Sequence, residues 1–145
     1  SSDLFQEILK RAKRGDSDNI DIYSDPFYIG ECSYKFRMRL HPNGNGKGEN
    51  THLSLFLANI EGKYDAILQW PFPKKVMLIL IDQQENPNER ESVSYPLTGE
   101  EEKWKSRPVK GKELFWGFPE FVSHKQLQKR AYIVDDTVFL QAKFE

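Results

Sequence analysis

Hydrophobic and polar residues alternate along much of this chain, and a two-residue period predicts β-strands. Residues 34–41 place Tyr34, Phe36, Met38 and Leu40 on one face, and Lys35, Arg37, Arg39 and His41 on the other. Residues 51–58 alternate in the same way, with Leu53, Leu55 and Leu57 inward and His52, Ser54 and Phe56 outward. An outward phenylalanine on an otherwise polar face marks a candidate contact surface.

Further strands follow from turns and apolar runs. The stretch Asn43–Gly48 contains two Asn-Gly pairs, which favour the tight turns of antiparallel hairpins. The continuous apolar run Val76–Ile81 predicts a strand covered on both faces. Residues 114–122 predict an aromatic strand, which Pro119 places at a sheet edge, and residues 138–144 predict a last strand.

Two short helices are also expected. The first ends at Gly15, and its helically spaced apolar residues are Leu4, Phe5, Ile8, Leu9 and Ala12. The second begins at a capping box of Ser123 and Gln126 and runs to about Arg130. The pattern therefore predicts an all-β antiparallel sandwich with one or two short helices, as a single domain over residues 1–145 whose first 23 residues are atypical.

Composition narrows the class of partner. The chain has 145 residues and a net charge of -1, which argues against nucleic acid as the main partner. Its apolar runs are too short to cross a bilayer, so no membrane insertion is expected. The single cysteine and the absence of glycosylation sequons favour a cytoplasmic setting.

Catalytic chemistry is not indicated. The three histidines and Cys32 have no zinc-like spacing, and Cys32 lacks the local signature of a nucleophile. The stretch Gly44–Gly48 lacks the ending of a phosphate loop, and Asp135-Asp136 suits a turn better than a paired-carboxylate site. We expect no enzyme activity from this domain, no cofactor and no metal.

What remains is a surface. Arg37, Arg39 and His41 would flank Phe56 if their strands pair, which places basic donors beside an apolar spot. This combination near an edge strand suits an extended acidic peptide. A solvated face with one stray aromatic residue is the alternative.

Several motifs resemble one known family. The motifs are Tyr34-Lys35 leading to Arg39, Asn43-Gly44-Asn45-Gly46, Thr51-His52-Leu53-Ser54-Leu55-Phe56, Trp70-Pro71-Phe72, Leu80-Ile81-Asp82-Gln83 and Asp135-Asp136-Thr137-Val138-Phe139. In this order and spacing they resemble the C-terminal domain of TNF-receptor-associated factors (TRAFs), over residues 24–145. The resemblance implies the meprin-and-TRAF-homology (MATH) fold, an eight-stranded antiparallel sandwich. One departure is Phe5-Gln6-Glu7-Ile8, which looks helical where the family has a Trp-Lys-Ile-like first strand.

The resemblance also implies a site. Phe115-Trp116-Gly117-Phe118-Pro119 is similar to the Gly-Phe-Gly-Tyr-like edge strand of the fourth and sixth family members. By this likeness the backbone of residues 115–118 pairs with an extended peptide, and Arg39 attracts its terminal acidic or aromatic group. Trp116 and Phe118 would form pocket walls. Phe118 replaces a tyrosine, and the serine cluster of several members is replaced by the acidic and basic residues 100–105.

The implied function is that of a cytoplasmic signalling adaptor domain that binds short peptide segments of receptors or adaptor proteins by β-strand addition. The family implies that a preceding coiled coil makes the full-length protein a homotrimer, whereas this fragment alone is expected to be monomeric. An upstream RING region in the full-length protein is compatible with the resemblance. Two rival functions are a MATH-type substrate receptor of a ubiquitin ligase and a carbohydrate-binding sandwich. The carbohydrate-binding hypothesis depends on aromatic side chains expected to be exposed, such as Trp104 and Trp116.

Overall fold

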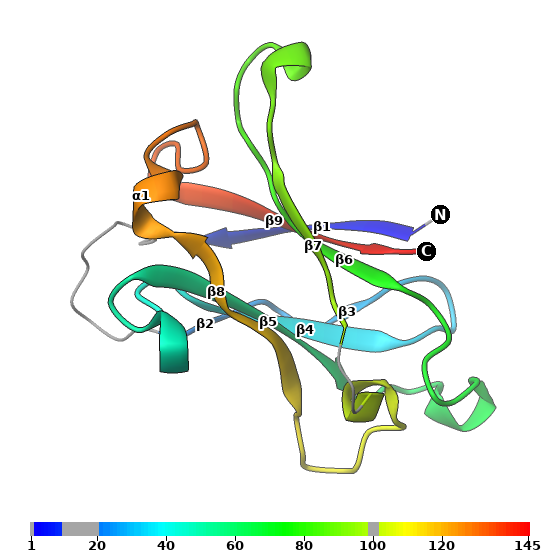
Figure 1. Cartoon of the computed structure of the whole chain (residues 1–145). Helices are drawn as coiled ribbons and strands as arrows, with labels where there is room; N and C mark the ends of the chain where they lie inside the picture. The colour runs from blue at the N-terminus through cyan, green and yellow to red at the C-terminus, as the bar shows by residue number, and fades with distance from the viewer. Residues whose placement is uncertain (1, 10–20, 99–101) are drawn as a thin grey trace.

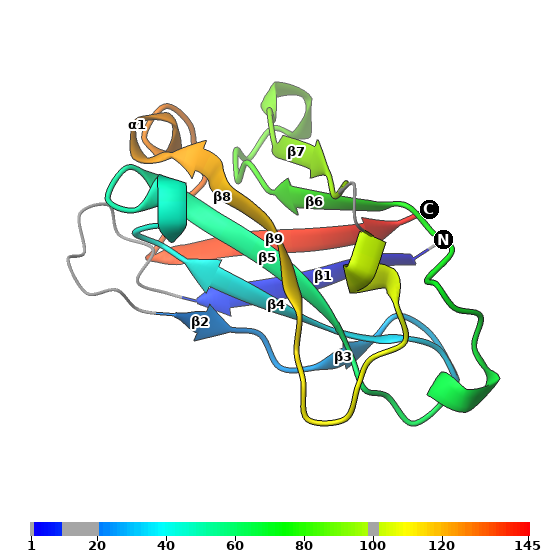
Figure 2. The ribbon, with the colours of Figure 1, turned by 60° about the horizontal axis from the view of Figure 1, so that its bottom comes forward.

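The computed structural model describes residues 2–9, 21–98 and 102–145, which form two antiparallel sheets packed as a sandwich (Figure 1). One sheet has the order β1-β9-β6-β7 and the other β2-β4-β5-β8, with β3 also paired to β4. Figure 2 shows β2, β4, β5 and β8 lying across the sheet that holds β1, β9 and β6. The strands are β1 (Ser2–Leu9), β2 (Ile22–Tyr23), β3 (Phe27–Tyr28), β4 (Lys35–His41), β5 (His52–Ile60), β6 (Val76–Leu80), β7 (Val93–Pro96), β8 (Phe115–Ser123) and β9 (Thr137–Phe144).

The predicted sandwich is confirmed. Strands β2 and β3 pair with two ends of β4, so they share one strand position and the layout has the eight positions expected. The helical segments within the described residues are α1 (His124–Leu127) and the 3-10 turns η1 (Gly46–Gly48), η2 (Asp65–Ile67), η3 (Pro87–Glu89) and η4 (Glu102–Lys105). None of these helices has the length and apolar character that a membrane span requires.

The N-terminal helix prediction is wrong. Residues Ser2–Leu9 form β1, which pairs antiparallel with β9 over eight positions from Ser2↔Phe144 to Leu9↔Thr137. The ladder formed with β9 outweighs the local helical spacing, because secondary-structure propensity is a weak preference that tertiary pairing overrides. The expected helix end at Gly15 lies outside the described residues.

The core lies between the sheets and follows the predicted alternation. Phe36, Met38 and Leu40 of β4 are fully buried, as are Leu53, Leu55 and Leu57 of β5. On β9 the buried face consists of Val138, Leu140, Ala142 and Phe144, as expected. Strand β6 differs from its prediction: Val76, Leu78 and Leu80 are buried, but Met77 and Ile79 are only half-buried. Its second face points away from the sandwich interior, so the strand is not covered on both sides.

The β4–β5 hairpin predicted from the Asn-Gly pairs is present, but its connection is not a tight turn, because it spans residues 42–51 and includes η1. Gly44 has φ +84°, and a Cβ there would lie 2.0 Å from the carbonyl oxygen of Gly48, so the turn before β5 requires glycine. Asp135 and Asp136 both adopt positive φ and form the turn that enters β9. The Ser123 hydroxyl accepts a hydrogen bond from the backbone N–H of Gln126 at 3.1 Å, although helix α1 ends earlier than expected, at Leu127.

The corner at residues 70–73 packs through aromatic side chains. The Trp70–Pro71 peptide bond is cis. The ring of Tyr34 lies edge-on to Trp70 at 5.1 Å and to Phe72 at 4.7 Å, and Phe72 is buried. The corner therefore joins the inner face of the β4 sheet to the start of β6 through one aromatic cluster.

Candidate functional site

Strand pairing places four residues in one row across the outer face of the β2-β4-β5-β8 sheet. Tyr23 is opposite Arg39, Arg39 is opposite Phe56, and Phe56 is opposite Gly117. The neighbouring row runs from Arg37 through Ala58 to Phe115. The predicted association of the β4 cations with Phe56 is therefore present in the structure, and it extends to β8.

Arg39 is held in place by its neighbours. Its Nη2 lies 2.8 Å from Oδ2 of Asp21, and its guanidinium lies 5.6 Å from the Tyr23 ring and 5.8 Å from the Phe115 ring. Its Nε is buried and has no hydrogen-bond partner among the described residues. Arg39 is thus an oriented cation whose ion pair with Asp21 engages Nη2, while its buried Nε is not accessible to a ligand.

Arg37 is more fully engaged. Its guanidinium stacks over Tyr23 at 4.6 Å, its Nε donates to the carbonyl oxygen of Ser24 at 3.2 Å, and its Nη1 lies 3.1 Å from Glu113. Both arginines are paired with a carboxylate, but Arg37 also donates from Nε to Ser24, so it has fewer donors left for an incoming carboxylate.

His41 is placed differently from the prediction. The side chain was expected on an exposed basic face, but the residue is only 7% exposed. Its Nδ1 lies 2.6 Å from Oδ1 of Asp21, and its Nε2 lies 3.2 Å from Nδ2 of Asn45, an arrangement that fits a neutral imidazole donating through Nδ1. Burial lowers the pKa of His41, as does Arg39, and together they outweigh the opposing effect of Asp21. His41 therefore orients Asp21, and its ring lies edge-on to Phe56 at 5.9 Å.

The four residues at positions 115–118 of β8 divide between two faces. Phe115 and Gly117 share the outer face with Arg39, and the Phe115 ring lies edge-on to Tyr23 at 5.7 Å. Trp116 and Phe118 alternate with them and point to the inner face. Trp116 is 39% exposed and donates from Nε1 to the carbonyl oxygen of Thr98 at 2.9 Å. The structure therefore does not bring Trp116 and Phe118 onto the face of Arg39.

On the inner face, Phe118 joins β8 to the other sheet. Its ring lies 5.7 Å from Tyr95 and 5.9 Å from Phe121. Tyr95 belongs to β7 and is 42% exposed. Trp116, Phe118 and Tyr95 consequently provide an apolar border along the open side of the sandwich.

Strand β8 is an edge strand, as Pro119 predicted. It pairs with β5 on one side, and its other side carries no strand among residues 2–9, 21–98 and 102–145. Gly117 lets it approach β5 closely, since a Cβ there would lie 2.2 Å from the carbonyl oxygen of Leu55. The β5–β8 register shifts between Leu53 and Leu55, and the buried hydroxyl of Ser54 donates to the Pro119 carbonyl oxygen at 2.5 Å. Within the described residues, this side of β8 is therefore open to pairing with another strand.

The sequence analysis missed two members of this site, Asp21 and Tyr23. Asp21 directly precedes the short strand β2, and the pairing of β2 with β4 places Tyr23 beside Arg39. The partner and register of this strand depend on the fold, so no local residue pattern shows that these residues meet Arg39.

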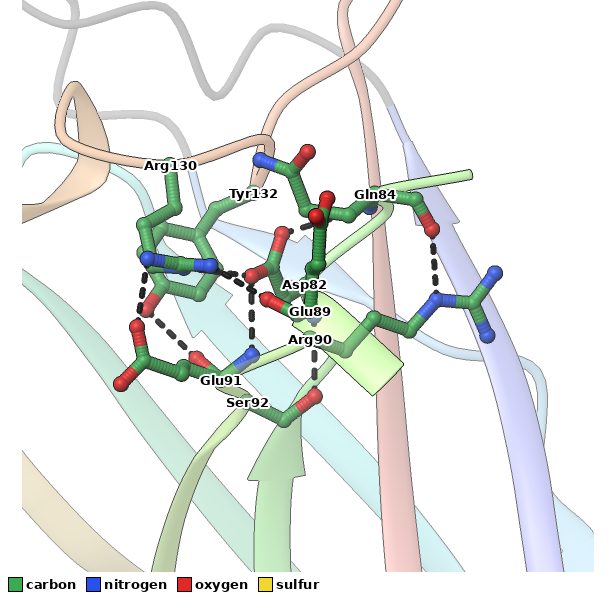
Figure 3. A network of polar contacts seen from close by, with 8 residues as sticks. All are labelled: Asp82, Gln84, Glu89, Arg90, Glu91, Ser92, Arg130 and Tyr132. Atoms are coloured by element: carbon green, nitrogen blue, oxygen red, sulfur yellow. Dashed lines mark hydrogen bonds and ion pairs between the residues drawn. The ribbon is translucent and has the colours of Figure 1, made fainter. Parts of the chain in front are cut away.

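A second polar cluster lies at the end of β6 (Figure 3). The fully buried carboxylate of Asp82 accepts hydrogen bonds from Arg130 Nε at 2.7 Å and from the backbone N–H groups of Glu91 at 2.9 Å and Gln84 at 3.3 Å. Arg130 also pairs with the Glu91 carboxylate at 2.5 Å. Burial raises the pKa of Asp82, but these partners outweigh burial, so the pKa lies below its usual value. The cluster ties the end of β6 to the segment after α1, which is a structural role.

Catalytic and metal chemistry find no support in the described part of the chain. No group of three or more His, Cys, Asp or Glu side chains there could hold a metal ion. Cys32 is an exposed, free thiol. Trp104 is only 2% exposed, so it does not form the exposed aromatic platform that the carbohydrate-binding alternative required.

Comparison with known proteins agrees with this geometry. The family model described as "TRAF/meprin, MATH domain" matches residues 19–141. TNF receptor-associated factor 5 of Homo sapiens is 36% identical over 135 residues, which are 92% of this chain and 24% of the relative. TNF receptor-associated factor 1 of Mus musculus is 37% identical over 124 residues, which are 84% of this chain and 30% of the relative. A solved structure of TRAF5 from Notothenia coriiceps matches with a TM-score of 0.84 and 28% identity, covering 99% of this chain and 73% of that chain.

The two-sheet sandwich and its motifs define a MATH domain, and this chain belongs to the TRAF/meprin MATH family. It spans 24% to 30% of the length of the two curated relatives named above.

Proposed function

We propose that this domain is part of a signalling adaptor and binds extended acidic peptides by adding them as a strand to the open edge of β8. The observation that carries the proposal is the unpaired edge of β8, flanked by Arg39 on one face and by Trp116 and Phe118 on the other. Ladder hydrogen bonds would supply affinity, and alternate side chains would supply specificity.

Each predicted site residue has a part in this proposal. Residues 115–118 offer backbone groups to the peptide, and the partly exposed guanidinium of Arg39 receives the acidic side chain. Phe56 and Phe115 form the apolar floor around Arg39. His41 and Arg37 act indirectly, because their own polar groups are engaged by Asp21 and Glu113.

The partner class follows from the family. The relatives are named for association with the TNF receptor, so receptor tails and adaptor segments are the first peptides to test. One edge and a few contacts imply weak single-site binding. We propose that the full-length protein acts in the cytoplasm as a trimer, since three linked sites raise avidity about 10²–10⁴-fold.

The test is a peptide array probed with the wild-type domain, Arg39→Ala and Arg37→Ala. Acidic peptides should bind the wild type, and Arg39→Ala should weaken them about tenfold, as expected for one charge-assisted hydrogen bond. Arg37→Ala is the matched control, because it removes the same charge type on the same strand from a carboxylate-paired guanidinium that lies opposite Ala58 rather than Phe56. The site is wrong if no acidic peptide binds, or if both variants weaken binding equally.

A further inference from the structure

A pocket of about 180 Å³ lies beside the start of β8, between η4 and the loop that follows it. Its apolar walls are Trp104, Pro108, Val109 and Leu114. Val109 and Leu114 are 62% and 58% exposed, so apolar surface continues outward from the pocket. Leu114 precedes β8, whereas the proposed docking edge begins at Phe115, so the pocket is a separate feature.

Two buried polar atoms on residues that line this pocket lack a partner. The Nε1–H of Trp104 and the Oδ1 of Asn59 make no hydrogen bond with any described residue. Trp104 is 2% exposed and Asn59 is 5% exposed, so a ligand must displace side chains at the pocket wall to reach the two atoms. The orientation of the Asn59 amide is fixed, because its Nδ2 donates to the carbonyl oxygen of Ser106 at 3.3 Å. A buried polar group without a partner is destabilising, so a ligand that pairs both atoms would be favoured.

The unpaired atoms have opposite requirements. The indole N–H needs an acceptor, and the amide oxygen needs a donor. A hydroxyl group can serve as both at once. The apolar walls require the remainder of the ligand to be hydrophobic, and an apolar cavity of about 150 Å³ is known to hold one benzene ring. A phenol therefore fits the pocket in size, polarity and hydrogen bonding.

The rim of the pocket is basic. Arg107 and Lys112 line it, and Lys110 lies between them in the sequence. The carboxylate of the same loop, Glu113, is paired with Arg37 at 3.1 Å, so it does not neutralise these cations. Negative charges beside the inserted group would be attracted to this rim.

We propose that this pocket binds the side chain of a tyrosine within an acidic segment of a partner protein. The phenol ring lies against Trp104, Pro108 and Leu114. Its hydroxyl accepts a hydrogen bond from Trp104 Nε1 and donates one to Asn59 Oδ1, while flanking carboxylates meet Arg107 and Lys112. This contact goes beyond strand addition at β8 and does not depend on it.

The test is a titration of the ¹⁵N-labelled domain with p-cresol, which carries the ring and hydroxyl of tyrosine, followed through the indole N–H signals of the three tryptophans. Trp104→Phe assigns the relevant signal. We expect p-cresol to shift the Trp104 signal saturably, and toluene, which lacks the hydroxyl, to shift it at least tenfold more weakly at equal concentration. The proposal is overturned if p-cresol leaves this signal unchanged, or if toluene acts equally.

A second titration extends the test to peptides and uses the wild-type fold throughout. An acidic peptide with one central tyrosine should bind about tenfold more tightly than the same peptide with phenylalanine, and it should shift the Trp104 signal. Arg107→Ala should weaken the peptide and leave p-cresol unaffected, because the charge contacts the flanking carboxylates. Equal binding of the two peptides would contradict the proposal even if β8 binds other peptides normally, so the two sites can fail separately.

Discussion

Arg39 and Trp116 lie on opposite faces of one sheet, although they pair with adjacent residues of β5, Phe56 and Leu57. Arg39 faces Phe56, Phe56 faces Gly117, and Trp116 precedes Gly117, so its side chain points the other way. A single pocket cannot use both residues. A strand added to β8 can, because its successive side chains alternate between the two faces of the extended sheet.

This geometry predicts an alternating response in a bound peptide. In the wild type, peptide residues on the Arg39 face should affect affinity through their charge. The alternate residues, on the Trp116 face, should affect affinity through their apolar size. Arg39→Ala should remove only the preference for acidic side chains, and Trp116→Ala should remove only the preference for large apolar side chains. Each variant should raise the Kd of the best peptide about tenfold. Isothermal titration of a position-scanned peptide checks this. Loss of both preferences in either variant would show that the two residues share one pocket.

Gly117 should be essential for the edge itself. A Cβ at this position would lie 2.2 Å from the Leu55 carbonyl oxygen, so Gly117→Ala must displace β8 from β5. We expect a loss of about 1–3 kcal/mol in the free energy of unfolding, in the range typical of overpacking, together with weaker peptide binding. Gly30→Ala is the control, because the nearest atom to its Cβ would lie 3.6 Å away. Urea denaturation measures both, and an equally small effect at the two positions would refute the close approach.

Acid should weaken the fold through Asp82. The pKa of Asp82 is lowered below its ordinary value of 3.8 in the folded protein, so its carboxylate stabilises the fold above that pH. This contribution is lost as pH falls from about 4 through the lower folded pKa, because the folded state resists protonation. Asp82→Asn should cost about 3 kcal/mol near neutral pH, as expected for breaking a buried pair. The variant should also lose stability less steeply than the wild type below pH 4. Chemical denaturation at a series of pH values measures this, and an equal slope in both proteins would contradict the role of Asp82.

The sequence predicted the sheet better than the site. Alternation alone placed Leu53, Leu55 and Leu57 in the core, because burial of one strand face imposes a period of two on the residue pattern. It failed for β1, where the ladder with β9 overrides the helical spacing of residues 2–9. Such a ladder joins residues from opposite ends of the chain, and no local pattern reports it.

The site shows the same limit. Arg39, Phe56 and the aromatic residues of β8 were identified from their residue types and from the family resemblance. Asp21 was not, because its role depends on the Ile22↔Leu40 pairing that places it within reach of Arg39 and His41. His41 was expected to be exposed, since strand alternation gives the face of a residue but does not show what covers that face.

Amide hydrogen exchange of β8, measured with and without a bound acidic peptide, tests the central proposal most directly. Strand addition predicts that alternate amides of residues 115–118, those directed away from β5, gain strong protection while the others are already slow. A peptide N-methylated at alternate positions should lose both the binding and the protection. If binding leaves the exchange of β8 unchanged, or if the N-methylated peptide binds normally, the peptide does not add to this edge.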